Sequence, residues 1–190
     1  MTQHMIFETI VVTTDAAGET HITPFGIRYQ NKQVLISPFM PSITLNNALA
    51  TQSATVNFTD DVRIFAGALT QHNIWKLKPA NAVSGYILEG ALAHKELQLI
   101  EVKEDRIRPT LIFDVVHQVN HQPFQGFNRA QSAVVELAVL VSRLHMLPIE
   151  KIQHEMQYLQ IAIDKTAGER ELEAWGWLVE KVNQKILSEN

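Results

Sequence analysis

Apolar and polar residues alternate with a period of two along most of the chain up to about residue 117. This pattern predicts strands at residues 6–14, 20–29, 33–37, 54–58, 86–94, 97–102 and 107–116, and one short helix at residues 42–51. A turn is expected at residues 15–18, where Gly18 can adopt a positive φ. Pro24 and Gly26 interrupt the second strand, so its middle is expected to be an edge, a bulge or a close approach to a ligand. Many short strands separated by turns favour a small barrel, because closure leaves no exposed edge.

From Asn128 onward the apolar positions recur at steps of three and four, which is the spacing of a helix face. Three helices are expected, with apolar seams over residues 130–144, 149–163 and 172–186. Pro148 is expected to begin the second helix, and Thr166 and Glu169 to form a capping box for the third. The pattern therefore predicts an α+β fold, with a barrel over residues 1–127 and a helical region over residues 128–190 that packs on it as one compact unit.

The first of these helices, expected from Arg129 to Leu147, is apolar nearly all round. Val135, Val139 and Leu140 lie beyond its main apolar seam. A small barrel cannot easily cover such a helix, so a second apolar surface is needed. This predicts a homodimer.

Composition and charge exclude several classes of protein. The 190 residues, of which 46% are hydrophobic, suit one globular domain with or without a helical appendage. The chain has no cysteine, which excludes disulfides and thiolate chemistry. The net charge of −4 is spread evenly, so no nucleic-acid partner is expected. The N-terminus does not resemble a signal peptide, and the charge-free residues 33–59 contain Pro and Asn, so we expect a soluble cytoplasmic protein with no membrane partner.

Few side chains fit a catalytic or metal-binding pattern. The Gly-x-Ser-x-Gly sequence of serine hydrolases is absent. His117 and His121 are four residues apart, but they leave a strand rather than share a helix face, so no metal site is expected. Asp60 and Asp61 could act as an acid–base pair, although their place before Val62 is also typical of a capped helical turn. The sequence therefore leaves the catalytic residues unknown.

Two regions are candidates for ligand binding. The segments 23–26, 37–39 and 42–47 offer hydroxyls, amides, aromatic rings and Pro or Gly backbone without a charge. This combination suits a flat heterocycle with a polyol tail, and loops that merely connect strands are the alternative interpretation. The second region is the expected helix start at Asn128, which is a good N-cap.

Arg129 follows this N-cap, at a position where the helix dipole disfavours a cation by about 0.3–1 kcal/mol. An anion shared between Arg129 and the free N–H groups of the helix end would account for the placement. A surface arginine that reaches a carboxylate such as Asp114 is the alternative.

Several segments resemble a known family. Glu-Thr-Ile-Val-Val-Thr-Thr at residues 8–14, followed by His-Ile-Thr-Pro-Phe-Gly at residues 21–26, resembles the opening of the domain of unknown function 447 family, which consists of FMN-binding split-barrel proteins related to flavin reductases. Residues 38–44, 56–65 and 127–130, with Glu136 and Arg143, fit the same family, so the resemblance covers nearly the whole chain. The family often has Ala-Pro-Met-Gly where this chain has Thr-Pro-Phe-Gly, so Phe25 could stack on the flavin or crowd it.

The resemblance implies a split β-barrel homodimer that holds FMN near the subunit interface. The positions that match expected cofactor contacts are Thr23, Pro24, Phe25 and Gly26 along the isoalloxazine edge, Ser42, Thr44 and Asn57 near the ribityl phosphate, Arg129 at the phosphate, and Phe39 and Asn47 as further candidates.

We therefore expect an FMN-dependent oxidoreductase of the flavin-reductase-like type, in which FMN carries out the redox chemistry with a small-molecule electron donor or acceptor. A flavin-binding protein without enzymatic activity, used for storage or as a scaffold, is the alternative. Because the chain has no Gly-x-Gly-x-x-Gly sequence, a nicotinamide would have to dock transiently.

Overall fold

The computed structural model describes residues 5–72 and 74–189, which form two compact units. The barrel unit comprises residues 5–59 and 75–124, and the helical unit comprises residues 60–72, 74 and 125–189. The barrel unit contains β1 (Phe7–Thr14), β2 (Thr20–Gln30), β3 (Gln33–Ile36), α1 (Ile43–Thr51), β4 (Ser53–Phe58), β5 (Leu77–Pro79), β6 (Tyr86–Leu88), β7 (Ala93–Lys103) and β8 (Thr110–Asn120). The helical unit contains α2 (Arg63–Thr70), α3 (Arg129–Val141), α4 (Ile149–Thr166) and α5 (Glu169–Glu189).

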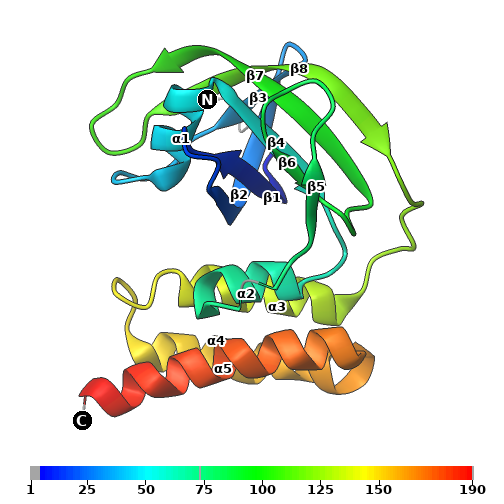
Figure 1. The fold of residues 1–190 in the computed structure, drawn as a ribbon. Coiled ribbons are helices and arrows are strands. Elements are labelled where there is room, and N and C mark those ends of the chain that lie inside the picture. Colours follow the sequence, from blue (N-terminus) through cyan, green and yellow to red (C-terminus); the bar gives the residue numbers. More distant parts are fainter. Residues whose placement is uncertain (1–4, 73, 190) are drawn as a thin grey trace. The chain divides into compact units, whose positions relative to one another are not determined.

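Six antiparallel strands close into a barrel in the order β1-β2-β3-β8-β7-β4, and β4 pairs back onto β1 (Figure 1). Side chains that alternate along these strands fill the barrel with a core that includes Val11, Ile27, Leu97 and Phe113. Helix α1 packs on this core through Leu45 and residues near it. β5 and β6 form a separate two-stranded sheet. The barrel that the alternating pattern predicts is therefore present.

Two tight turns set the register of the first strands. Between β1 and β2, the Asp15 carboxylate accepts hydrogen bonds from the N–H groups of Ala17 and Glu19, and Gly18 has a φ of +92°. Between β2 and β3, Asn31 and Lys32 have φ values of 51° and 69°, which is the backbone conformation of a two-residue hairpin turn. The first turn was predicted at the correct residues.

Strand β2 is continuous through Pro24 and Gly26, and both residues pair with β1. A close approach to a ligand stays a prediction here; the group that lies against Gly26 belongs to the chain itself, because a Cβ on Gly26 would lie 2.6 Å from the Cγ2 atom of Ile6. The single strand expected at residues 86–94 is wrong: a turn at Glu89 and Gly90 divides it, so that its first part pairs with β5 and β7 begins only at Ala93.

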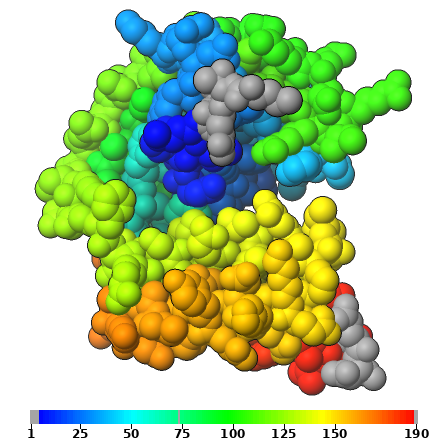
Figure 2. Space-filling view, turned by 180° about the vertical axis from the view of Figure 1, so that it is seen from behind, coloured from blue at the N-terminus to red at the C-terminus, as the bar shows by residue number. Residues whose placement is uncertain are grey.

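The helical unit contains α2 in addition to the three helices expected from the sequence. Residues 60–72 and 74, which the sequence analysis assigned to the barrel region, group with the C-terminal helices because α2 packs against α3 and α5. Leu137, Ile152 and Leu178 are fully buried within this unit. Helix α4 keeps a mostly exposed outer side, which Figure 2 shows in yellow and orange.

The helix ends differ from those expected. α3 stops at Val141 rather than Leu147, and turns over residues 142–146 lead to Pro148, which caps α4 as predicted. The predicted capping box of Thr166 and Glu169 is wrong, because Thr166 is still the last residue of α4. Its hydroxyl donates to the carbonyl of Ala162, and Glu171 instead accepts a hydrogen bond from the N–H of Gly168.

No helix among residues 5–72 and 74–189 is long and apolar enough to cross a membrane.

Candidate functional site

The four β2 residues predicted to lie along a flavin do not share one face of the strand. Phe25 packs against the barrel core, and the alternation of strand residues places Thr23 on the same side. Pro24 and Gly26 point the other way, and all four are half-buried. The Phe25 ring is therefore part of the barrel packing, and only Pro24 and Gly26 present the outer side of the strand.

Three further predicted residues belong to α1 and hold it in place. Ser42 is the N-cap of α1, and its hydroxyl accepts a hydrogen bond from the N–H of Leu45 at 3.1 Å. The Asn47 amide donates to the hydroxyl of Thr13 on β1 at 3.2 Å. Thr44 and Asn47 are both buried, so the solvent-facing polar group of this set is Ser42, which is half-buried.

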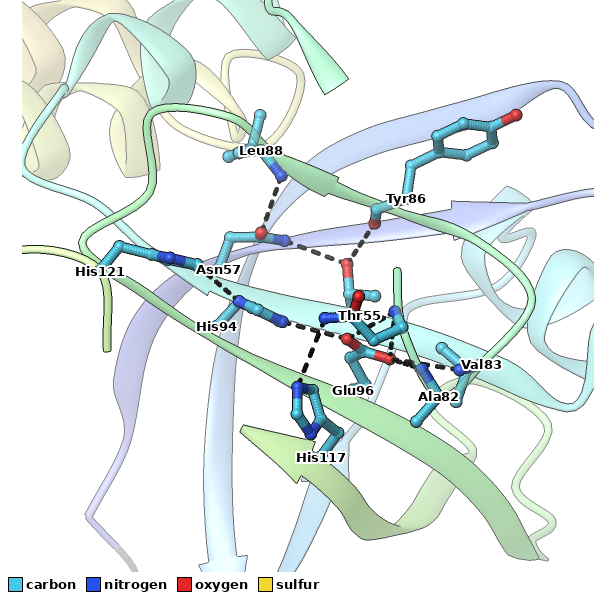
Figure 3. A network of polar contacts seen from close by, with 11 residues as sticks. Thr55, Asn57, Ala82, Val83, Tyr86, Leu88, His94, Glu96, His117 and His121 are labelled. Carbon is cyan, nitrogen blue, oxygen red and sulfur yellow. Dashed lines mark hydrogen bonds and ion pairs between the residues drawn. The ribbon is translucent and has the colours of Figure 1, made fainter. Parts of the chain in front are cut away.

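Asn57 on β4 is completely buried and joins three strands. Its amide nitrogen lies within hydrogen-bonding distance of the Thr55 hydroxyl and the Ile10 carbonyl, and its carbonyl oxygen accepts from the N–H of Leu88. Both ends of the side chain are engaged by the protein, as Figure 3 shows. A cofactor contact by Asn57 stays a prediction, whereas its role in joining β1, β4 and β6 is evident.

Phe39 lies beside Arg108, which together with Arg28 binds Ser37; the sequence pattern singled out neither arginine. Its ring is 63% exposed, and the Arg108 guanidinium lies 4.6 Å from the ring centroid. Arg108 Nε donates to the carbonyl of Ser37, and an Arg28 Nη atom donates to the Ser37 hydroxyl at 2.6 Å. The same hydroxyl lies 2.9 Å from that of Thr110. We call Arg28, Ser37, Phe39, Arg108 and Thr110 the Ser37 cluster.

The Ser37 cluster carries two positive charges on the outside of the barrel unit. Among the described residues, neither Arg28 nor Arg108 has a carboxylate within 4.0 Å. Arg28 follows Gly26 by two positions on β2 and lies on the same outward side of the strand. Arg28 lies on β2 and Arg108 lies in the segment before β8. Because they are so far apart in the sequence, no local motif contains both, and they come together only in the folded chain.

Arg129 begins α3 in the helical unit and is exposed, as predicted. Asn128 is the N-cap, and its side-chain oxygen accepts from the N–H groups of Ala130 and Gln131. The Ala130 N–H also donates to the Thr166 hydroxyl at 3.0 Å. These bonds occupy donors that the anion interpretation of Arg129 requires to be free, so a phosphate contact rests on the guanidinium itself.

The Asp61 carboxylate, a weak acid–base candidate, has a structural role. Both of its oxygens bind Arg63, at 2.9 Å to Nε and 2.7 Å to an Nη atom, and Arg63 also pairs with Glu173 on α5 at 3.0 Å. The hydrogen bonds with Asp61 raise the pKa of Arg63 above its ordinary value. A helix does follow Asp61, whose Oδ1 accepts from the N–H of Arg63 at 3.2 Å, but the N-cap residue Val62 makes no side-chain capping bond.

A second polar cluster lies on β7 and β8 (Figure 3). His94 and Glu96 are two positions apart on β7, and Glu96 pairs in register with His117 of β8. His94 Nε2 lies 3.1 Å from Glu96 Oε1, and His94 Nδ1 lies 2.8 Å from Nε2 of His121. His94 and Glu96 are fully buried, whereas His117 is half-buried and His121 is exposed.

Glu96 is held as a carboxylate by the backbone that covers it. Burial opposes its ionisation, but hydrogen bonds from the N–H groups of residues 81–83 and from His94 outweigh burial and hold the pKa of Glu96 below its ordinary value. Sequence analysis examined His117 only against His121. The signal it missed is the His-x-Glu spacing at residues 94–96, which places both side chains on one face of a strand.

Cavities lined by described residues lie in the barrel unit. One of about 550 Å³ is lined by Phe58, Phe124, His121 and their neighbours, and another, of about 400 Å³, is lined by residues of the β1–β2 turn and the segment 79–86. Neither is lined by a residue predicted to contact the cofactor.

Family models match most of the sequence. The N-terminal domain model of a protein of unknown function (DUF447) matches residues 7–122, and a second model described as protein of unknown function (DUF447) matches residues 128–180. The chain belongs to the DUF447 family. The recognition made from the sequence segments is therefore confirmed, and no curated protein matched the chain.

Solved structures share the DUF447 fold. An FMN-bound DUF447 protein from Methanosarcina mazei is 18% identical, with a TM-score of 0.80 over 94% of this chain and 96% of that one. The 2-nitrobenzoate 2-nitroreductase of Pseudomonas fluorescens is 14% identical, with a TM-score of 0.55 over 60% of this chain and 64% of that one. An FMN-binding protein from Thermus thermophilus, with bound 1-cyclohex-2-enone, is 15% identical, with a TM-score of 0.51 over 63% of this chain and 72% of that one. These similarities confirm the α+β split-barrel fold, and the first of them includes the C-terminal helices.

Proposed function

We propose that this DUF447 chain binds FMN and acts as an oxidoreductase of the flavin-reductase-like type. The observation that carries the proposal is the similarity over 94% of the chain to an FMN-bound member of the same family. Nitroreductase and flavin oxidoreductase structures among the weaker matches support the same chemistry. The weakness of every acid–base candidate is consistent with it, because a flavin enzyme needs protein groups mainly for binding and orientation.

The Ser37 cluster fits the phosphate end of FMN. Arg28 and Arg108 lie beside one another through Ser37 and have no carboxylate partner among the described residues. Guanidinium groups bind phosphate through charge-assisted hydrogen bonds. The hydroxyls of Ser37 and Thr110 bond to each other, which leaves one neutral O–H donor at the same place. We therefore assign the phosphate to Arg28 and Arg108, with Arg129 of the helical unit as the second candidate.

The outer side of β2 and the Phe39 ring fit the flat part of the cofactor. Pro24 shares its side of the strand with Arg28, whereas the Ile6 side chain lies over Gly26 on that side. The exposed Phe39 ring offers a stacking surface next to Arg108. When bound there, FMN would supply the two-electron redox chemistry that the side chains lack. The contribution of the protein is to bind and orient the cofactor, and to leave one side of it open to a small electron donor or acceptor.

A homodimer is part of the proposal. Exposed large apolar side chains are frequent on the barrel unit, and they include Ile6, Phe39, Met40, Ile43 and Ile107. Apolar surface of this kind is expected to be covered by a partner. A second copy of the chain would cover it.

Anaerobic reduction tests the oxidoreductase part of the proposal. Protein loaded with FMN should lose its flavin absorbance on addition of NADH or NADPH, and should recover it when an acceptor such as oxygen or a nitroaromatic compound is added. If neither NADH nor NADPH reduces the bound FMN, and no acceptor reoxidises it, the result would instead favour a flavin storage or scaffold protein.

A further inference from the structure

We propose that His94, Glu96 and His117 form a binding site for a zinc-class divalent cation on the outside of the barrel. Each residue offers one ligand atom, and these three atoms lie within 4.8 Å of one another. The set of two imidazoles and one carboxylate is one that zinc uses when a fourth position is left to water or to another ligand. This site is independent of the proposed flavin chemistry, because none of its residues belongs to the Ser37 cluster.

The two buried ligands are already at metal-site spacing. His94 Nε2 and Glu96 Oε1 are 3.1 Å apart. Zinc bonds of about 2.0–2.1 Å in a tetrahedral arrangement place ligand atoms about 3.3 Å apart. Both side chains are fully buried on β7, so they lose little freedom on binding. The half-buried His117 ring, directly across from Glu96 on β8, completes the set by moving inward and leaves a route for the ion from solvent.

The second shell that a metal site requires is also in place. A histidine that binds a metal through one ring nitrogen usually donates a hydrogen bond from its other ring N–H to a neighbouring acceptor, and this bond fixes the orientation of the ring. His94 has such a neighbour, because its Nδ1 lies 2.8 Å from His121 Nε2. Glu96 Oε2 accepts from the N–H groups of residues 81–83, which hold the carboxylate in position. In the metal-bound form His94 carries its proton on Nδ1 and donates it to His121.

The charge of the site also favours a cation. Glu96 places a negative charge in a position with no exposed surface, and its ion-pair partner among the described residues is His94, which is neutral unless protonated. Buried charges in proteins are usually paired or bound to metals. A divalent cation would neutralise Glu96 and join β7 to β8 and to the segment 81–83.

Metal titration of the stripped protein tests this site. The full chain is dialysed against a chelator, freed of the chelator and titrated with Zn²⁺ by calorimetry, and then with Co²⁺ while visible absorbance is recorded. We expect one equivalent per chain and an intense Co²⁺ spectrum of the four-coordinate type. Wild-type protein that binds no zinc would overturn the proposal and leave the cluster as a hydrogen-bond network.

Three histidine variants supply the matched comparison. His117→Ala removes a ligand and should weaken zinc binding by more than about 100-fold, whereas His121→Ala removes a second-shell partner and should weaken it by about 10–100-fold. His154→Ala, on the exposed side of α4, should leave it unchanged. His117→Gln replaces the alanine variant if circular dichroism shows a folding defect. Zinc affinity that is unchanged in the His117 variant would contradict the assignment.

Discussion

Two arginines far apart in the sequence meet at the hydroxyl and carbonyl of Ser37, and among the described residues neither has a carboxylate within 4.0 Å. Sequence reasoning favoured Arg129 for the same role, because a cation at a helix start suggests a shared anion. The capping of that helix end by Asn128 and Thr166 removes part of this argument. The phosphate contact can therefore be tested by comparing single residues.

Arg108→Ala should weaken FMN binding by about tenfold to hundredfold, since a hydrogen bond to a charged group contributes about 1.5–3 kcal/mol. It should change riboflavin binding far less, because riboflavin has no phosphate. Fluorescence titration with both ligands measures the difference. Arg106→Ala, an exposed arginine in the same segment, is the control and should change neither affinity.

The same titration applied to Arg129→Ala decides between the two candidates. If Arg129→Ala loses more FMN affinity than Arg108→Ala does, and keeps its riboflavin affinity, Arg129 is the residue that contacts the phosphate. Equal losses for FMN and riboflavin in either variant would mark a structural role for that arginine.

For Asn57, a structural role and a role in FMN binding can be told apart by measuring stability and FMN affinity in the same variant. Asn57→Ala should lower the free energy of unfolding by about 1–3 kcal/mol, because it leaves the buried Leu88 N–H without its partner. Urea denaturation measures this, with Asn46→Ala on the exposed side of α1 as the control. Unchanged stability combined with lost FMN affinity would show instead that Asn57 acts on the cofactor.

At the scale of elements, one capping residue, Asn128, connects the start of α3 to the end of α4. Asn128 accepts from two N–H groups at the start of α3 and donates to the carbonyl of Thr166 at the end of α4. Asn128→Ala should therefore destabilise the helical unit by about 1 kcal/mol. Asn128→Ser should restore most of the loss, since serine also caps helices. Thermal unfolding of the three proteins checks this, and equal melting temperatures would contradict it.

Elements with a strong local signal were predictable, and elements defined by their partners were not. The β1–β2 turn and the start of α1 at Ser42 follow from Asp15, Gly18 and the N-cap preference of serine. The division of residues 86–94 does not, because β6 becomes a separate strand only through its pairing with β5. Helix α2 likewise joins the helical unit through contacts with α3 and α5 that lie far away in the sequence.

The candidate site shows the same limit. Residue types pointed to the segments 23–26, 37–39 and 42–47 as candidates for ligand binding, and that role stays a prediction. Strand alternation divides the first segment between core and surface. Strand pairing and loop packing bring Arg28 close to Arg108, and Glu96 close to His117. Because the partners are far apart in the sequence, no local spacing of residues predicts these pairs.

At the scale of the whole molecule, the exposed apolar side chains of the barrel unit predict association. We expect light scattering at micromolar concentration to give twice the chain mass of 21.5 kDa. The exposed apolar side chains, among them Phe39 and Ile107, favour this. A stable monomer would contradict the dimer and would require the flavin to bind on one chain alone.

The central claim is that this chain is a flavoprotein, and flavin binding by the purified protein tests it most directly. Protein purified without added flavin, then titrated with FMN, should show the absorbance spectrum of bound flavin and a higher melting temperature. At a free FMN concentration one hundred times the dissociation constant, binding adds about 2.7 kcal/mol to the stability of the folded state. A colourless protein whose melting temperature does not change with FMN would contradict the account.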